Sequence, residues 1–334
     1  MIAEKCIKNE IFTELTPTFK DPFGRTFKKL RLSVLPSCNF NCIYCDPGAS
    51  PSHLSGMSHS LSLEKLLGTV QKIHEQTNLT SVRITGGEPL LYKNLPELIF
   101  QLKSMKISSV KITTNASRLY ERLPELKEAG IDGFNISLDA VDSSVFLKMS
   151  GQKGNLKQIL KAVDECIRLE IPIKLNATLV RGCNENQVLP LLEFAMSRNI
   201  SIRYIELMDM GPLFGKTKER LFPEKEILES IQKSYTLTSL RREKNSTARY
   251  FRVNGSSYVF GIISNSSSPF CQDCDRLRLS SEGMIFGCLS ENRGFSVRNL
   301  KSSEEWGDVL TKALKQKKSD SFSGSSLSMK NIGG

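Results

Sequence analysis

Short apolar runs alternate with amphipathic stretches through the first two thirds of the chain, and this alternation constrains the fold most. The six runs, rich in β-branched residues, are 30–35, 81–85, 109–113, 133–138, 173–179 and 202–207. The stretches between them, with apolar residues at helical spacing, include 63–74, 94–105, 119–129, 156–169 and 188–196. Strands that alternate with helices form a parallel sheet, and right-handed crossovers curl it toward a barrel. We therefore expect an α/β fold, an incomplete (β/α)6 TIM-like barrel.

The pattern changes after residue 210. Gly211, Pro212, Gly215 and Pro223 interrupt the chain, and residues 236–286 alternate like antiparallel strands. We therefore expect two regions, a partial barrel over 1–215 and a smaller α+β region over 216–334 that covers the barrel opening. Six serines and a glycine within residues 319–328 predict a mobile segment before the end of the chain.

Charge and length narrow the function classes. The net charge of +11 predicts an anionic partner. No stretch approaches the roughly 20 apolar residues of a membrane span, and the first residues lack the apolar core of a secretion signal. No nucleic-acid motif such as an RNP sequence is present, which favours a nucleotide-sized anion over a polymer. We expect a cytoplasmic protein that binds neither membranes nor nucleic acid.

Three of the nine cysteines follow the first predicted strand directly. Cys38, Cys42 and Cys45 have the spacing C-x3-C-x2-C, which arises by chance in roughly 0.6% of chains with this cysteine content. Three thiolates in one loop hold a soft metal centre and leave a coordination position open. The alternative is a structural zinc site completed by a distant residue.

A second set of three cysteines lies in the C-terminal region. Cys271, Cys274 and Cys288 have the spacing C-x2-C-x13-C, and the sequence DRLRLS lies between the last two. A structural zinc site is again the alternative, because a bare C-x2-C is a weak motif. We expect the remaining cysteines to be ordinary thiols.

The first cysteine spacing resembles that of the radical S-adenosylmethionine (SAM) enzymes. The sequence TGGEPLL, which contains Gly86, Gly87 and Glu88 after the second strand, resembles the GGE segment of that superfamily. The resemblance implies that Cys38, Cys42 and Cys45 hold a [4Fe-4S] cluster, with SAM bound at the fourth iron.

Both cysteine sets, the sequence DRLRLS and the terminal Gly333 and Gly334 narrow the resemblance to the GTP 3′,8-cyclase family of radical SAM lyases. This resemblance implies a second [4Fe-4S] cluster on Cys271, Cys274 and Cys288. It also implies conversion of GTP to (8S)-3′,8-cyclo-7,8-dihydroguanosine 5′-triphosphate, the first step of molybdenum cofactor biosynthesis. In that family a 5′-deoxyadenosyl radical removes the 3′ hydrogen of GTP, and the ribose then bonds to carbon 8 of the guanine.

The resemblance also implies roles for single residues. Those implied to bind GTP are Arg25, Arg83, Thr114, Lys174, Arg203, Arg276, Leu277 and Arg278. Those implied to lie near SAM are Tyr44, Gly87, Ser137 and Met208. The residues implied to act in catalysis are Arg276, Arg278, Gly333 and Gly334. Two positions depart from the family pattern, since Ser81 replaces a common Lys or Arg and Ala116 replaces a common Gly.

The resemblance further implies partners. These are a low-potential electron donor of the flavodoxin or ferredoxin type and, downstream, the cyclic pyranopterin monophosphate synthase; a homodimer is left open. Two alternatives remain at this point. One is a radical SAM peptide-modifying enzyme, whose additional clusters use more C-terminal cysteines than the three present here. The other is a zinc-stabilised nucleic-acid-binding protein, which metal analysis would separate from the iron enzymes.

Overall fold

The computed structural model describes residues 19–45 and 60–332. Six strands form its central parallel sheet: β1 (Lys29–Ser33), β2 (Ser81–Thr85), β3 (Ser109–Thr114), β4 (Phe134–Ser137), β5 (Ile173–Leu179) and β6 (Ser201–Glu206). Each strand pairs in parallel with the next one along the chain. The predicted parallel sheet is therefore confirmed, with its strands in the predicted places.

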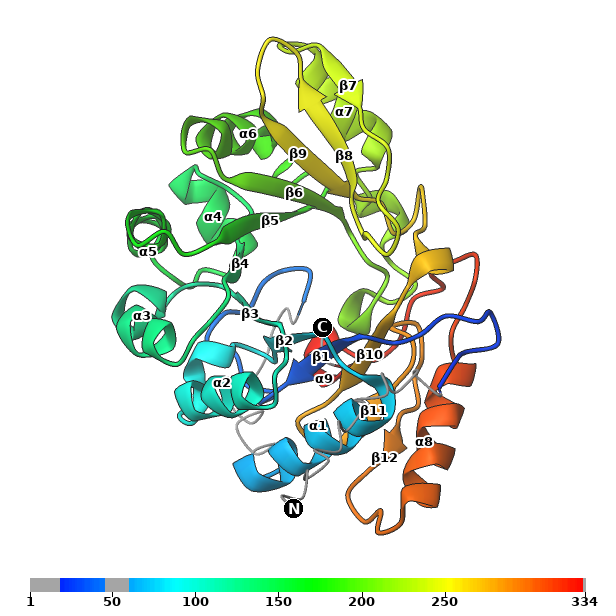
Figure 1. The fold of residues 1–334 in the computed structure, drawn as a ribbon. Coiled ribbons are helices and arrows are strands. Elements are labelled where there is room, and N and C mark those ends of the chain that lie inside the picture. Colours follow the sequence, from blue (N-terminus) through cyan, green and yellow to red (C-terminus); the bar gives the residue numbers. More distant parts are fainter. Residues whose placement is uncertain (1–18, 46–59, 333–334) are drawn as a thin grey trace, which may run out of the picture.

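Helices cover the outer face of this curved sheet (Figure 1). They are α1 (Leu63–Thr77), α2 (Leu95–Ser104), α3 (Leu119–Glu128), α4 (Ser143–Met149), α5 (Leu156–Arg168) and α6 (Val188–Ser197). Helix α5 shows why they form: the Asn155 side chain accepts a hydrogen bond from the Gln158 N–H at the first turn, and one apolar face is buried. Helix α4 was not predicted, because seven residues are too short to show a period.

The C-terminal region extends both edges of the same sheet. Its elements are α7 (Glu224–Gln232), β7 (Leu237–Ser239), β8 (Arg249–Val253), β9 (Val259–Ile263), β10 (Arg276–Leu279), β11 (Met284–Phe286), β12 (Phe295–Ser296), α8 (Ser303–Lys315) and α9 (Met329–Ile332). Strand β9 pairs in parallel with β6, and β10 pairs in parallel with β1. The order in the described residues is β12-β11-β10-β1-β2-β3-β4-β5-β6-β9-β8-β7, and the two ends do not pair. The incomplete barrel is therefore confirmed.

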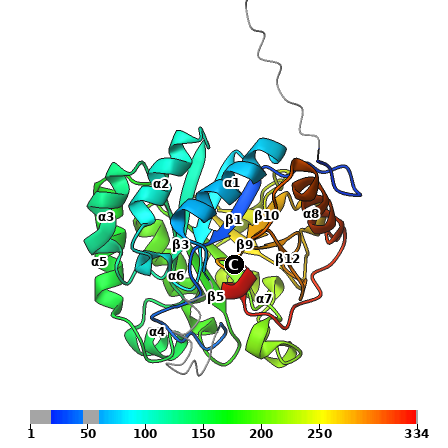
Figure 2. The ribbon, with the colours of Figure 1, turned by 90° about the horizontal axis from the view of Figure 1, so that it is seen from below.

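The end of the chain returns to the middle of the molecule, where α9 lies against β1 (Figure 2). Ser325 is fully buried, and its backbone exchanges hydrogen bonds with Asp209 and Gly211. Its hydroxyl also donates to Asn292 Oδ1 at 2.7 Å. At Ser325 hydrogen bonds of the serine therefore take the place of apolar packing, while the mobility of residues 319–328 stays a prediction. Gly333 and Gly334 lie outside the described residues.

Burial alternates along the central strands. In β1, Leu30 and Leu32 are buried in the core, while Arg31 faces the hollow of the sheet. Polar and charged side chains therefore gather inside the curve, and apolar ones pack outside it. In the described ranges, no helix is both long enough and apolar enough to cross a bilayer.

Candidate active site

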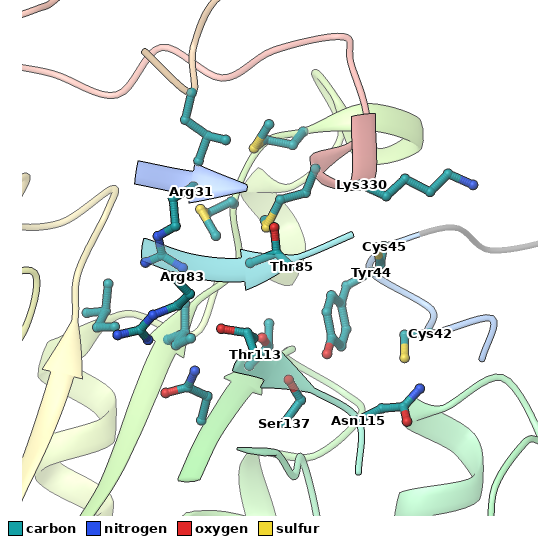
Figure 3. A pocket seen from close by; sticks show the side chains of 18 of the residues that line it. Arg31, Cys42, Tyr44, Cys45, Arg83, Thr85, Thr113, Asn115, Ser137 and Lys330 are labelled. Atoms are coloured by element: carbon teal, nitrogen blue, oxygen red, sulfur yellow. The ribbon is translucent and has the colours of Figure 1, made fainter. Parts of the chain in front are cut away.

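A cavity opens inside the curve of the sheet, and residues from β1, β2, β3, β4, β5, β6, β9 and β10 line it. All three cysteines of the first set, Cys38, Cys42 and Cys45, are among the lining residues. Arg31 and Arg83 reach into the same space from two neighbouring strands (Figure 3). The cavity thus combines a set of thiols with a set of cations.

The first cysteine loop is held against α4 by the backbone. The Asn41 N–H donates to Ser150 O, and the Ile43 N–H donates to Met149 O. Burial raises the pKa of Cys38 to about 12, with a further contribution from the negative charges of Glu88 and Cys45. Burial likewise raises the pKa of Cys42. These thiols therefore need a bound cation to become thiolates, as metal ligands do.

The donor set of this loop fits an iron–sulfur cluster. Cys45 raises the pKa of both Cys38 and Cys42, so the three thiols are close neighbours, and all three face one cavity. Within the described ranges, no three His, Cys, Asp or Glu side chains converge on a single ion. A [4Fe-4S] cluster does not require such convergence, since each of its cysteines binds a different iron.

Tyr44 ties the cysteine loop to the end of β4. Its hydroxyl donates to Asp139 Oδ2 at 2.8 Å, and Asp139 Oδ1 accepts from the Thr178 N–H at 2.8 Å. Burial raises the pKa of Asp139 to about 6, although these two hydrogen bonds lower it in part. The Tyr44 ring is therefore held in place between the second and third cysteines.

The GGE segment is joined to the cysteine loop by its backbone. The Gly87 N–H donates to Leu35 O, and the Glu88 N–H donates to Ser37 O. The Glu88 carboxylate accepts from Thr114 Oγ1, the Asn115 N–H and the Leu90 N–H at 2.5 to 3.0 Å. Burial raises the pKa of Glu88 to about 7, against the effect of those hydrogen bonds. In the described structure, Glu88 therefore joins the ends of β2 and β3.

Gly87 allows these two loops to touch. A Cβ at this position would lie 2.0 Å from Ser37 O, a backbone atom that cannot rotate away. We expect Gly87→Ala to lower the free energy of unfolding by about 1–3 kcal/mol in chemical denaturation. The control is Gly68→Ala in α1, where a Cβ meets nothing within 4 Å; it should raise stability by about 0.5–1 kcal/mol. Equal stability of the Gly87 variant and the unmodified protein would contradict this account.

The second cysteine set lies behind the cavity wall. None of Cys271, Cys274 and Cys288 is a lining residue, but the adjacent Phe270 and Leu289 are. Burial raises the pKa of Cys271, and the neighbouring Cys288 and Cys274 raise it further, so the three thiols are close neighbours.

Two cations contact one thiol of this set. Arg276 Nη2 lies 3.3 Å and Lys317 Nζ lies 3.4 Å from Cys274 Sγ. Burial by itself would raise the pKa of Cys274, but these two positive charges outweigh it and lower the pKa to about 5. The two cations therefore favour the thiolate form of Cys274, which is the form that binds iron.

Five arginines line the cavity: Arg31, Arg83, Arg203, Arg276 and Arg278. Burial lowers the pKa of Arg83 to about 9, and the positive charges of Arg203 and Arg276 contribute. The side chains of Arg31 and Arg83 form no ion pair or hydrogen bond with another described residue. Such a concentration of buried positive charge favours the binding of a polyanion.

The structure brings together most of the residues singled out from the sequence. Lining the cavity are Tyr44, Arg83, Gly87, Thr114, Ser137, Arg203, Met208, Arg276 and Arg278. Lys174 lies outside the lining, near the opposite end of β5. The side chain of Leu277 is buried in the core, because it alternates with the two arginines of β10.

Arg25 is not among the residues that line the cavity. It forms an ion pair with Asp21, and its guanidinium donates to the backbone oxygens of Cys271, Gln272 and Lys318. It therefore binds the loop of the second cysteine set and does not face the cavity. Among the arginines that line the cavity, Arg31 is one that was not singled out from the sequence. The sequence could have indicated it, because Arg31 stands between two apolar residues of a strand, Leu30 and Leu32, and so points to the opposite face.

Comparisons with known proteins agree with this geometry. Residues 32–195 match the radical SAM superfamily, and residues 200–322 match the family described as Molybdenum Cofactor Synthesis C. The chain is 33% identical to a GTP 3′,8-cyclase of Staphylococcus epidermidis over 307 residues, which cover 89% of each protein. It is 37% identical to a GTP 3′,8-cyclase of Helicobacter pylori over 270 residues, 80% of this chain and 82% of the relative.

A solved structure shares the fold. Streptococcus suis SuiB bound to S-adenosylmethionine superposes with a TM-score of 0.61 at 15% identity, over 87% of this chain and 68% of SuiB. At that identity the likeness concerns the fold alone.

Proposed function

Since this chain belongs to the GTP 3′,8-cyclase family of radical SAM enzymes, we propose that its cavity holds SAM and GTP side by side for the cyclisation. The reaction converts GTP to (8S)-3′,8-cyclo-7,8-dihydroguanosine 5′-triphosphate, the first step of molybdenum cofactor biosynthesis. The observation that carries the proposal is that the first cysteine set and the five arginines open into one cavity.

The SAM end of the cavity is formed by the cysteine loop and the ends of β2, β4 and β6. Cys38, Cys42 and Cys45 would hold the first [4Fe-4S] cluster, which with bound SAM supplies the radical that removes the 3′ hydrogen of GTP. Gly87 lets a ligand approach the backbone closely. Ser137 and Met208 line the same end, and the anchored Tyr44 fixes the loop.

The arginines hold the triphosphate. Arg31, Arg83 and Arg203 project from three strands toward one space, so they can bind several phosphate oxygens at once. Arg203 is oriented by hydrogen bonds to Asn176 Oδ1 at 3.0 Å and Asn135 Oδ1 at 2.8 Å. Fixing the phosphates in this way orients the ribose toward the SAM end and excludes water from it.

The second cysteine set would hold a second [4Fe-4S] cluster at the guanine end. Support comes from the thiolate character of Cys274 and from Arg276 and Arg278, which extend from β10 between this set and the cavity. The first cluster would then belong to the partial barrel, residues 1–215, and the second to the C-terminal region, residues 216–334. Arg276 and Arg278 would bind the base and stabilise it while the new bond forms.

The proposed reaction also defines partners. It requires a low-potential one-electron donor, for which a flavodoxin or ferredoxin is suitable, and its product would pass to the cyclic pyranopterin monophosphate synthase. A cytoplasmic location fits, because free thiols stay reduced there.

An anaerobic assay tests the function. Protein reconstituted with iron and sulfide is given GTP, SAM and dithionite, and products are followed by mass spectrometry. We expect 5′-deoxyadenosine together with a product of the mass of GTP. Deoxyadenosine without a GTP-derived product would indicate another substrate, and neither product from iron-loaded protein would overturn the catalytic assignment.

A further inference from the structure

Residues 264–270 join the end of β9 to Cys271 of the second cysteine set, and we call them the bridging segment. Strand β9 pairs with β6, and β10, which follows the segment, pairs with β1, so the chain passes here from one edge of the central sheet to the other (Figure 1). Asn265 and Phe270 of this segment line the cavity. The bridging segment is therefore a wall of the cavity and also leads into the second cysteine set.

Glu206, the last residue of β6, holds the bridging segment. Its side chain is fully buried. The carboxylate accepts from the Ser266 N–H at 2.9 Å and the Ser267 N–H at 3.0 Å, and the Ser267 hydroxyl donates to it as well. A fourth donor is the Glu224 N–H at 2.8 Å, in the first turn of α7, where a negative charge is favourable. One buried carboxylate thus joins β6, α7 and the bridging segment.

A second carboxylate supports the same segment in a different way. The Ser264 hydroxyl donates to the carboxylate of Glu224, which also forms an ion pair with Arg249 of β8 at 2.8 Å. Glu206, in contrast, is held within the described ranges by N–H and O–H groups rather than by a counterion. The contribution of Glu206 is therefore to accept hydrogen bonds in fixed directions.

Asn265 lies between two serines that are held in this way, and it faces the cavity. It is only 4% exposed, and its Nδ2 has no acceptor in the described structure. A buried amide without an acceptor is costly, and a molecule bound in the cavity would supply one. Asn265 is therefore suited to donate a hydrogen bond to a ligand.

The far end of the bridging segment contacts the β10 arginines. Arg276 Cζ lies 5.0 Å from the centroid of the Phe270 ring, a cation–π contact. Arg276 also contacts Cys274 of the second cysteine set. A shift of the bridging segment would therefore move two side chains of the cavity wall and disturb a third.

We propose that Glu206 is a positioning residue for the cyclisation, because it fixes the bridging segment so that the Asn265 amide donates to GTP. The inference rests on the proposed function. GTP is the ligand concerned, since the segment leads directly into the second cysteine set, where that function places the guanine. Glu206 itself is not a lining residue, so it acts through the segment.

Glu206→Gln tests this role because it keeps the size and shape of the side chain. In either orientation the new amide nitrogen faces at least one backbone N–H, which loses its acceptor. On the reconstituted enzyme we expect the ratio of cyclised product to deoxyadenosine to fall about tenfold, since small misplacements of a binding group slow a reaction strongly. Anaerobic calorimetry should show GTP binding weakened about tenfold. Deoxyadenosine should still form, because the first cysteine set is untouched.

Three further variants separate positioning from contact. Ser267→Ala removes one donor to Glu206 and should lower the product ratio about threefold. Ser268→Ala is the matched control, since its side chain lies outside the cavity lining, and it should leave the ratio unchanged. Asn265→Ala should lower the ratio and the GTP affinity as Glu206→Gln does. Hydrogen exchange of residues 264–270, measured by mass spectrometry, should become faster in Glu206→Gln but not in Asn265→Ala.

The outcomes are distinguishable. If Glu206→Gln kept the product ratio and the GTP affinity of the unmodified enzyme, Glu206 would only fill space and the proposal would be overturned. An equal loss in Ser268→Ala and Ser267→Ala would overturn it too. Absence of a GTP-derived product from the unmodified enzyme would instead refute the proposed function.

Discussion

Replacing Cys38, Cys42 or Cys45 with alanine is expected to abolish 5′-deoxyadenosine formation and to halve the bound iron. Two clusters supply about eight irons per chain, and the loss of one leaves about four. Each of the three thiols faces the cavity, so no other described cysteine is placed to replace it. Iron analysis, ultraviolet–visible spectra and deoxyadenosine yield measure the effect.

The second cysteine set gives a contrast within the same experiment. Cys288→Ala should also leave about four irons but should retain SAM cleavage, because the first set is intact. Cys183→Ala, which removes a partly buried thiol outside both sets, is the control and should retain about eight irons. Full iron content in Cys38→Ala or Cys288→Ala would contradict the ligand assignment, and stoichiometric zinc would support the zinc alternative.

The second large effect concerns the arginines of β10. Arg276→Ala and Arg278→Ala should lower the yield of cyclised product by roughly 100-fold or more, the usual effect of removing a donor aimed at a reacting group. Deoxyadenosine should still form, because neither side chain belongs to the first cysteine loop. Mass spectrometry gives the ratio of cyclised product to deoxyadenosine.

Arg252→Ala is the matched control for these variants. It removes an exposed arginine of β8 and should leave the product ratio unchanged. If Arg278→Ala gave the same ratio of cyclised product to deoxyadenosine as the unmodified enzyme, the role assigned to the β10 arginines would be contradicted. Since Arg276 also contacts Cys274, the iron content of Arg276→Ala must be measured, whereas Arg278→Ala reports on the substrate more directly.

The central sheet could be predicted because each strand carries its own signal. Runs such as 173–179 are rich in β-branched and apolar residues and are bounded by polar ones. The helices between the strands have apolar residues on one face only, as α5 shows. The partners of β9 and β10 could not be predicted, since they pair with β6 and β1 across long stretches of sequence. Nothing local in either strand specifies which edge it joins.

In the site, too, features carried by residues close in sequence could be predicted, and those that depend on the fold could not. Cysteine spacing and the GGE segment identify one end of the cavity, because their residues are close in sequence. Arg25 and Arg31 both precede the first cysteine, and only the burial pattern of β1 shows that Arg31 faces inward.

The pairing of β1 with β10 has a consequence for how the protein is made. Lys29 and Arg276 are register partners although about 250 residues separate them in the chain. At a synthesis rate of roughly 5–20 residues per second, one edge of β1 stays without its native partner for about 10–50 s on the ribosome. An unpaired strand edge is prone to aggregation. That nascent edge is therefore a place where the chain can aggregate before β10 has been synthesised.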